Sequence, residues 1–249
     1  LLDSTYTGSA IRVRRSSDNT EQDIGFNVFS ELDTVSLLAF AGTGDAFVKT
    51  WYSQTGSNDA TQTTTSAQPQ IVSSGAVITE NGKPAIQFNG VGNTLEASVI
   101  STDIISTNAE NTLLSVMTQD SASAANGLVS MASPRYVTYT DYNGVLYYDA
   151  GNNSTNRLSV AAPAGWDDTQ HLLFWSSSLT LQQISVDGSQ IASNTSQSTI
   201  ASASATLIIG TYTQSFFQGN VQELVLFPLD KQTDRTGIET NVNTFYSIY

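Results

Sequence analysis

From residue 111 onward, hydrophobic residues come in short runs that turn-forming residues separate. Four of these runs follow one another, namely NTLLSVMTQ (111–119), GLVSMAS (127–133), RYVTYTD (135–141) and GVLYYDAG (144–151). Further on, the apolar run HLLFW leads into LQQISV, a turn at Asp187-Gly188 and another run. Short strands with Gly, Asn and Asp between them predict an antiparallel β-sandwich.

Two segments have signals of a helix rather than a strand. The first is ELDTVSLLAFAG (31–42), where Asp33 or Thr34 is the predicted N-cap and Gly42 the predicted end. The second closes the chain, and its apolar residues recur at spacings that place them on one helix face, namely Ile238, Val242, Phe245 and Tyr249. Its predicted N-cap is Asp230 or Thr233. We expect this helix to pack over a sheet or against a sheet edge.

The amino-acid composition excludes some classes of binding partner. The chain has 249 residues, 39% hydrophobic and 12% charged, with a formal net charge of -13. Nucleic-acid binding needs a cationic surface, so we expect no nucleic acid partner. No run reaches the roughly 18 apolar residues of a membrane span. The absence of cysteine excludes disulfides and thiolate metal sites.

Two stretches of sequence resemble known families. The order of elements from His171 to Asn243, with LIIG, an F-x-G-N turn and ELVLF before the final helix, resembles the second half of a laminin-G-like, concanavalin A-type jelly roll. The segments YTGSAIRVRRSSDNTEQDIGF, AFVKTWYSQTGSNDATQTT and QPQIV…NGKPAIQFNG resemble the first half of the arabinofuranosidase B catalytic domain. Uncharacterised phage and bacterial proteins share these runs and the final IETNVNTFYSIY segment.

The resemblance implies a fold more firmly than an activity. We expect an all-β, concanavalin A-like jelly-roll sandwich of two antiparallel sheets, with one short helix in the N-terminal half and one C-terminal helix. We expect residues 1–249 to form a single laminin-G-like domain that is cut from, or part of, a larger protein, because the chain begins without methionine. Arabinofuranosidase domains are longer and rich in disulfides, and their catalytic motifs are not located here.

Tyrosines give the strongest sign of a ligand. Five of them fall within thirteen residues, namely Tyr136, Tyr139, Tyr142, Tyr147 and Tyr148, and Trp166 follows. Sugars stack on aromatic rings while polar groups bind their hydroxyls. Because neighbours on a strand point to opposite sides, only about half of these rings can share one surface. The predicted sugar-binding residues are Tyr139, Asp141, Tyr142, Asn143, Tyr147 and Trp166, and packing of the tyrosines is the alternative.

An acidic segment follows a basic one near the N-terminus. Arg12, Arg14 and Arg15 precede SSDNTEQD (16–23). These arginines are expected to pair with nearby carboxylates, and an anionic-ligand site is the alternative. Calcium prefers carboxylate and carbonyl oxygens. The segment lacks the spacing of an EF-hand, so the predicted calcium site is irregular, with Asp18, Glu21 and Asp23 as its ligands.

Catalytic signals are weak. The lone histidine, His171, begins an apolar strand, where a structurally satisfied ring is the simplest interpretation, and no H-E-x-x-H or G-x-S-x-G motif is present. Glycosidases need two carboxyl groups about 5–5.5 or 6.5–9.5 Å apart. The candidates, each of which could equally be a solvated charge, are Glu96, Glu110, Asp141, Asp149, Asp167, Asp168 and Glu223.

Three functions follow from these observations. The first is a carbohydrate-binding or adhesive module on a cell exterior or virion surface, with an extracellular or cell-surface polysaccharide as partner. The second is a structural virion component that assembles with other virion proteins. The third, less favoured because no catalytic motif is found, is an arabinofuranosidase-type hydrolase. A homo-oligomer is compatible with each of them.

Overall fold

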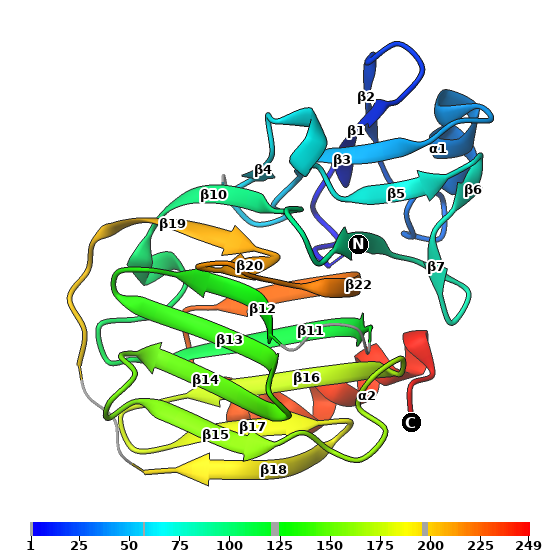
Figure 1. Cartoon of the computed structure of the whole chain (residues 1–249). Helices are drawn as coiled ribbons and strands as arrows, with labels where there is room; N and C mark the ends of the chain where they lie inside the picture. Colours follow the sequence, from blue (N-terminus) through cyan, green and yellow to red (C-terminus); the bar gives the residue numbers. More distant parts are fainter. Residues whose placement is uncertain (1, 57, 121–124, 196–198) are drawn as a thin grey trace.

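The computed structural model describes residues 2–56, 58–120, 125–195 and 199–249. It is an almost all-β structure in which two antiparallel sheets face each other, as expected for a jelly-roll sandwich with a C-terminal helix (Figure 1). Helix α2 (Arg235–Tyr246) lies behind the far sheet, and a group of N-terminal strands lies at one end of the sandwich. No helix of the described residues is long and apolar enough to cross a membrane.

Six antiparallel strands form the first layer, called here the front sheet. In spatial order they are β10 (Leu95–Ile100), β19 (Ser204–Ile209), β12 (Ala125–Met131), β13 (Arg135–Tyr142), β14 (Val145–Gly151) and β15 (Arg157–Ala161). The short strands β20 (Thr211–Tyr212) and β21 (Ser215–Phe216) form a hairpin beside β12.

Six further strands form the second layer, called the back sheet. In spatial order they are β9 (Ile86–Asn89), β22 (Gln218–Phe227), β11 (Asn111–Gln119), β16 (Gln170–Ser177), β17 (Gln182–Val186) and β18 (Ser189–Asn194). The two central strands, β11 and β16, are buried along nearly their whole length. Figure 1 shows them between the front sheet and α2.

The N-terminal strands join the two sheets. They are β1 (Ile11–Arg15), β2 (Glu21–Ile24), β3 (Ala46–Trp51), β4 (Ala60–Thr61), β5 (Gln70–Ser73) and β6 (Ala76–Val77). Strand β3 pairs with β5, which reaches β9 of the back sheet, and also with β4, which reaches β10 of the front sheet. The small hairpin β7 (Thr79–Glu80) and β8 (Lys83–Pro84) follows.

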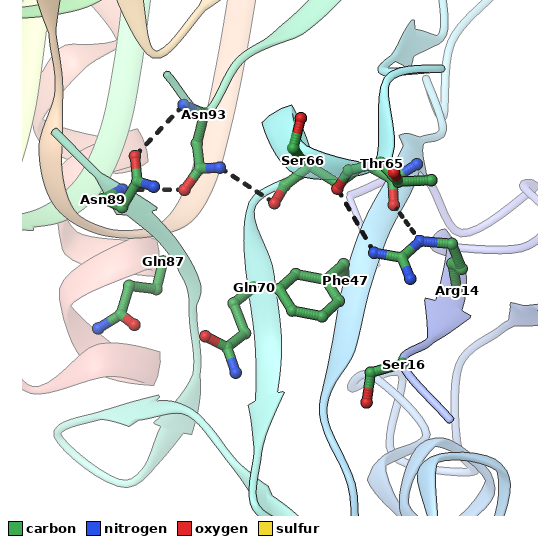
Figure 2. A pocket seen from close by; sticks show the side chains of 10 residues that line it. Arg14, Ser16, Phe47, Thr65, Ser66, Gln70, Gln87, Asn89 and Asn93 are labelled. Carbon is green, nitrogen blue, oxygen red and sulfur yellow. Dashed lines mark hydrogen bonds between the residues drawn. The ribbon is translucent and has the colours of Figure 1, made fainter. Parts of the chain in front are cut away.

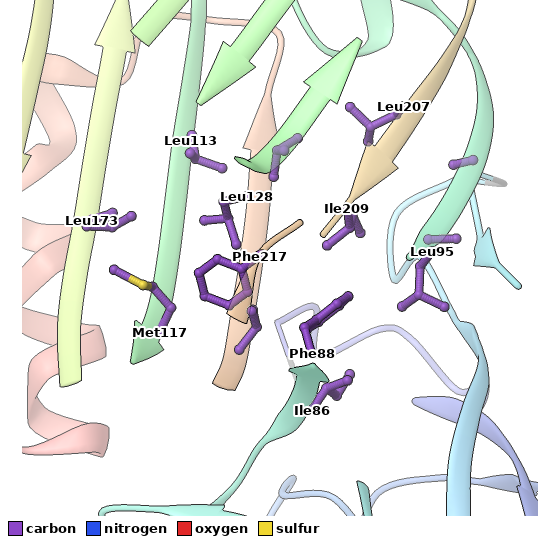
Figure 3. Close-up of a cluster of buried hydrophobic side chains, with 14 of the residues drawn as sticks. Ile86, Phe88, Leu95, Leu113, Met117, Leu128, Leu173, Leu207, Ile209 and Phe217 are labelled. Carbon is purple, nitrogen blue, oxygen red and sulfur yellow. The ribbon is translucent and has the colours of Figure 1, made fainter. Parts of the chain in front are cut away.

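The space between the sheets is filled by one large hydrophobic cluster. Figure 3 shows part of it, where Leu113 and Met117 of β11 meet Leu128, Ile209 and Phe217. Tyr136 and Tyr148 of the front sheet also point inward, and their rings pack edge to face at 6.1 Å. Burial of apolar surface on this scale is the main stabilising term of such a fold.

A second cluster lies on the outer face of the back sheet. Residues of the opposite strand parity, Leu114, Val116, Leu172 and Phe174, point away from the main core, and α2 covers them with Val242 and Tyr246. All nine residues of β11 are therefore buried, and its apolar sequence does not alternate with polar residues. The C-terminal helix thus packs over a sheet, one of the two arrangements expected.

The helix boundaries follow the sequence in one case and depart from it in the other. Helix α1 (Thr34–Ala41) begins after Asp33, whose side chain accepts from the Ser36 N–H at 3.1 Å, and ends at Gly42, as predicted. The predicted N-cap of α2 is wrong. A short 3-10 helix, Gln232–Asp234, precedes α2, and the Asp230 carboxylate accepts a hydrogen bond from the backbone N–H of Gln232. Helix α2 therefore begins only after Asp234.

The predicted apolar face of α2 needs one correction. Val242 is buried and Ile238 packs beside it, whereas Phe245 and Tyr249 are largely exposed. Tyr246 occupies the position expected of Phe245. Spacings of four and of three residues both fit one helix face, so periodicity alone did not decide between them.

Candidate functional site

The outer face of the front sheet gathers aromatic and charged side chains. Cross-strand partners share a face of a sheet, and the register pairs Tyr139 of β13 with Tyr147 of β14, and Asp149 of β14 with Arg157 of β15. Arg135 lies at the start of β13 on the same face, because its position differs from that of Tyr139 by an even number of residues.

A glycine brings one more tyrosine to this face. Strand β20 runs against Gly127 of β12, where a Cβ atom would lie 2.6 Å from the backbone nitrogen of Tyr212. A residue with a side chain would therefore push β20 away. The close approach places the Tyr212 ring 5.9 Å from the ring of Tyr139 in an edge-to-face arrangement.

Four rings form what we call the tyrosine cluster: Tyr139, Tyr142, Tyr147 and Tyr212. Their edge-to-face contacts have centroid distances of 5.4, 6.2 and 6.1 Å around the triangle of Tyr139, Tyr142 and Tyr147. Each such contact contributes about 0.5–1.5 kcal/mol beyond area burial. Tyr139 is buried at the centre, and this burial raises the pKa of its hydroxyl. Tyr142 stands 43% exposed at the edge.

A buried carboxylate holds two arginines beside the rings. Asp149 is 0% exposed and accepts from Arg135 Nε at 2.6 Å and from Arg157 Nε and Nη2 at 2.7 and 2.8 Å. The hydrogen bond to Asp149 raises the pKa of the Arg157 guanidinium. One anion between two cations leaves this region positive, within a chain whose net charge is -13.

Both guanidinium groups also lie over aromatic rings. Arg135 sits 4.6 Å from the centroid of Tyr212 and donates a hydrogen bond to its hydroxyl, and Arg157 sits 4.8 Å from the centroid of Tyr147. Cation–π contacts of this kind contribute about 0.5–1 kcal/mol at exposed sites. The arginines are therefore fixed before any ligand arrives, which lowers the entropic cost of binding.

A groove of about 990 Å³ continues from the tyrosine cluster along the same face. Tyr212 belongs to both, so the two features form one continuous surface. Hydroxyl groups predominate among the polar residues of the lining, which comprises Asn58, Ser98, Val99, Ile100, Asp103, Ser130, Ala132, Ser133, Ser204, Ala205, Thr206, Ile208, Tyr212 and Thr213. Such a lining can exchange hydrogen bonds with a polyhydroxyl ligand.

The structure places the predicted tyrosines on both faces of the front sheet. Strand alternation accounts for this except at Tyr142, which reaches the outer face because the pairing of β13 is irregular between Tyr139 and Asp141. Tyr139, Tyr142 and Tyr147 share the outer face, whereas Tyr136 and Tyr148 belong to the core. Asp141 lies near the end of β13, and Asn143 lies in the turn that follows. The Asp141 carboxylate accepts from the Gly144 N–H at 2.6 Å, and burial raises its pKa. Asp141 therefore stabilises the turn that follows Tyr142.

Trp166 lies elsewhere. It is 3% exposed and stacks on His171 with ring centroids 4.4 Å apart. The other contacts of His171 are the Asp187 carboxylate at 2.7 Å and the Trp166 carbonyl at 3.1 Å. The histidine ring is thus satisfied within the fold, which agrees with its structural interpretation.

Three residues of the site were missed by sequence reasoning. Tyr212 was not selected because its strand joins this face only through the contact at Gly127. Arg135 and Arg157 begin predicted strands, and nothing in their own segments indicates that both converge on Asp149. Asp149 itself was considered only as a catalytic carboxylate.

The carboxylates available for hydrolysis are constrained. Asp149 has no exposed surface, so it cannot contact a substrate in this arrangement. Glu223 lies in β22 of the back sheet, where it hydrogen-bonds Tyr246 of α2, and burial raises its pKa. It therefore belongs to the opposite side of the sandwich from the tyrosine cluster.

The predicted calcium ligands are engaged by cations. Asp18 pairs with Arg15 at 2.6 Å, Asp23 with Arg12 at 2.6 Å, and Glu21 with Lys49 at 2.7 Å. The hydrogen bonds from the arginines lower the pKa of Asp18 and of Asp23. Across the described part of the chain, no three His, Cys, Asp or Glu side chains gather as metal ligands. Asp18, Glu21 and Asp23 do not form a calcium site in this arrangement, because each already pairs with a different basic side chain. Calcium binding stays a prediction from the sequence.

Comparison with known proteins gives a structural likeness alone. No family model and no curated protein matches the sequence, so the predicted membership of the laminin-G family and the predicted similarity to phage proteins have no support from these comparisons. A GH54 α-L-arabinofuranosidase variant soaked with 4-nitrophenyl α-L-arabinofuranoside superposes with a TM-score of 0.71 at 16% identity. An arabinofuranosidase complexed with arabinofuranosyl-α-1,2-xylobiose gives 0.71 at 15% identity.

These likenesses establish the fold. The aligned region covers 97% of this chain and 60% of each arabinofuranosidase structure, so the chain spans little more than half of their length. A Trypanosoma rangeli sialidase in complex with the inhibitor DANA is more distant, with a TM-score of 0.52 at 13% identity over 80% of this chain and 30% of the sialidase.

Proposed function

We propose that this protein is a carbohydrate-binding module whose ligand lies across the outer face of the front sheet. The observation that carries the proposal is the continuity of the tyrosine cluster with the hydroxyl-lined groove through Tyr212. Aromatic rings offer apolar faces to sugar rings, and the fixed guanidinium groups and hydroxyls offer hydrogen bonds to sugar hydroxyls.

The size of the surface favours an oligosaccharide over a single sugar. The groove of about 990 Å³ lies at the upper end of ligand sites, which span about 300–1,000 Å³. The tyrosine cluster adds a second contact area beyond it. A chain of several sugar units can occupy both areas, with Tyr212 at their junction.

The structural neighbours support a carbohydrate ligand by analogy. Among the solved structures that superpose on this chain, one was soaked with an arabinofuranoside, one is complexed with arabinofuranosyl-α-1,2-xylobiose and one is in complex with a sialidase inhibitor. Similarity of fold does not transfer a reaction. An arabinoxylan-derived oligosaccharide is nevertheless the first ligand class to test.

Hydrolysis is the second candidate, and the fold shared with arabinofuranosidases is the observation that favours it. The burial of Asp149 under two arginines weighs against it, because a glycosidase needs two carboxyl groups that reach the glycosidic bond. We expect no release of nitrophenol from 4-nitrophenyl α-L-arabinofuranoside. Turnover well above that of a buffer blank would replace the binding proposal with the enzymatic one.

We further propose that the module works on a cell exterior or a virion surface, with a polysaccharide as partner. The polar, weakly charged composition supports this setting. A structural virion role, with other virion proteins as partners and a homo-oligomeric assembly, stays the alternative. Calcium as a cofactor also stays a prediction, so binding is to be measured with and without it.

The test is a glycan array that includes arabinoxylan oligosaccharides. Wild-type protein is expected to bind a defined glycan, and Tyr142→Ala is expected to lose that binding. Phe245→Ala is a matched control, because Phe245 and Tyr142 are both 43% exposed aromatic residues and Phe245 lies on α2. An array without binders would favour the structural role. Equal binding by Tyr142→Ala and wild type would place the glycan elsewhere.

A further inference from the structure

Arg14 differs from every other basic residue of the chain. The sequence contains nine Lys and Arg residues. Eight of them pair with a carboxylate among the described residues, and Arg14 pairs with none. Its exposed fraction is only 7%. A buried charge without an opposite charge is costly, so this arrangement calls for a function.

Neutral oxygen atoms hold the Arg14 guanidinium in place. Gln68 Oε1 accepts from Nε at 2.7 Å, Asn19 Oδ1 accepts from Nη1 at 2.8 Å, and the Thr65 carbonyl accepts from Nη2 at 3.4 Å. These bonds orient the group without neutralising it. A guanidinium has five N–H donors, so capacity for a further acceptor remains.

The charge faces a cavity of about 450 Å³. One row of cross-strand partners runs along it, from Arg14 to Phe47, from Phe47 to Gln70 and from Gln70 to Gln87. Partners in register share a face, so the row places a cation, an aromatic ring and two amides side by side across β1, β3, β5 and β9. Figure 2 shows Phe47 between Arg14 and Gln70.

The rest of the lining is polar and uncharged. Ser16, Thr65, Ser66, Gln68, Asn89 and Asn93 complete it, and none of the ten lining residues is acidic. The Gln87 side chain forms no hydrogen bond with any described residue, which leaves its amide available to a ligand. The Arg14 guanidinium lies 4.9 Å from the centroid of Phe47, so the ring also fixes the cation.

We propose that this cavity binds a hexuronic acid, with the sugar carboxylate on Arg14 and the sugar hydroxyls on Gln70, Gln87 and Asn89. A single planar guanidinium matches the two oxygens of a carboxylate. The neutral amides match hydroxyl groups, which both donate and accept hydrogen bonds. The volume lies within the usual range for small-molecule sites, about 300–1,000 Å³.

The proposal concerns a site separate from the outer face of the front sheet. None of the ten lining residues belongs to the tyrosine cluster or to its groove. The two sites can therefore be tested independently. Arg14→Gln is expected to leave the binding of an outer-face glycan unchanged, and Tyr142→Ala is expected to leave the binding of a uronic acid unchanged.

Isothermal titration with sodium glucuronate tests the ligand class. Glucuronate is expected to bind at least roughly tenfold more tightly than glucose, which lacks the charge, and than acetate, which lacks the hydroxyls. Inorganic phosphate is the comparison for a simple anion site. Absent glucuronate binding, equal affinity for glucose, or tighter binding of phosphate would overturn the proposal.

Two variants locate the site, and a third is the control. Arg14→Gln is expected to weaken glucuronate binding at least roughly tenfold, because it removes a charge-assisted hydrogen bond. Gln87→Ala removes only a neutral partner and is expected to weaken it a few-fold. Arg12→Gln removes an exposed arginine of the same strand, one that pairs with Asp23 outside the cavity, and is expected to bind like wild type.

Folding of each variant is checked by circular dichroism before titration. If Arg14→Gln does not fold, two other measurements test the site: titration of Gln87→Ala with glucuronate, and NMR chemical-shift mapping of the wild-type protein with glucuronate. Shifts centred on residues of β1, β3, β5 and β9 are expected. Full glucuronate affinity in Gln87→Ala, or shifts centred on β13 and β14, would contradict the proposed site.

Discussion

The two outer faces of the sandwich have similar positions in the fold but opposite chemistry. The outer face of the back sheet is apolar, and α2 covers it with Val242 and Tyr246. The outer face of the front sheet carries the tyrosine cluster and the arginines that Asp149 holds, and no helix of the described residues covers it. Of these two outer faces, the front one presents polar groups to solvent that are already held in place, whereas the back one is covered by a helix. We therefore propose that the ligand binds to the front face, whereas the back face contributes to stability alone.

The largest expected effect is the loss of a residue under α2. Phe174→Ala removes a fully buried ring from the second hydrophobic cluster and is expected to lower the free energy of unfolding by about 3–5 kcal/mol. Urea unfolding measures it. A loss below about 1 kcal/mol would show that packing between α2 and the back sheet contributes little to stability, which would contradict the contrast drawn between the two faces.

Next comes the carboxylate beneath the front face. Asp149→Asn weakens three charge-assisted hydrogen bonds and is expected to cost about 2–3 kcal/mol, less than a fully buried pair because both arginines reach solvent. Asp23→Asn, at an exposed pair with Arg12, is the matched control and should cost less than about 1 kcal/mol. Equal losses in the two variants would show that Asp149 is an ordinary surface ion pair.

A smaller effect separates binding from stability. Tyr142→Ala is expected to lower the free energy of unfolding by only about 1 kcal/mol, because it removes two edge-to-face ring contacts from a side chain that is 43% exposed. Under the proposed function, it is expected to weaken glycan binding at least roughly tenfold, or about 1.4 kcal/mol. Calorimetric titration beside urea unfolding measures both quantities. A variant that loses stability and keeps its affinity would reverse the roles given to the two faces.

The smallest expected effect concerns pH. Burial raises the pKa of Glu223, which hydrogen-bonds Tyr246 under α2. A folded pKa above the unfolded value means that the folded state binds more protons, so this contribution to stability is present below the unfolded pKa and is lost as pH rises through the folded pKa. Glu223→Gln should flatten that part of the stability profile measured by urea unfolding. An unchanged slope would contradict this assignment.

Much of the fold could be predicted from sequence because local patterns determine it. The short runs between turns specify the sandwich, and in β11 neighbouring apolar residues such as Leu113 and Leu114 are buried on opposite faces, one of which α2 covers. Helix α1 follows its capping residues closely. The start of α2 was mistaken because Asp230 caps a short preceding turn instead of the helix itself.

The candidate sites could be predicted only in part, because they depend on contacts between distant segments. Alternation along β13 and β14 was enough to separate Tyr139 from Tyr136. It could not show that β20 brings Tyr212 to the same face. Nor could it show that Gln87, far from Arg14 in sequence, lines the same cavity. Pairing of the N-terminal arginines with carboxylates was predicted, and Arg12 and Arg15 do pair in this way. The sequence could not show that Arg14 has neutral partners instead.

Hydrogen–deuterium exchange of the wild-type protein with an arabinoxylan oligosaccharide mixture tests the central claim most directly. Ligand contact slows exchange where backbone amides become less accessible or less mobile. Protection is expected in β13, β14, β19 and β20, which carry the tyrosine cluster and its groove, with α2 unchanged. Protection confined to α2 and the back sheet would contradict the assignment of binding to the open front face.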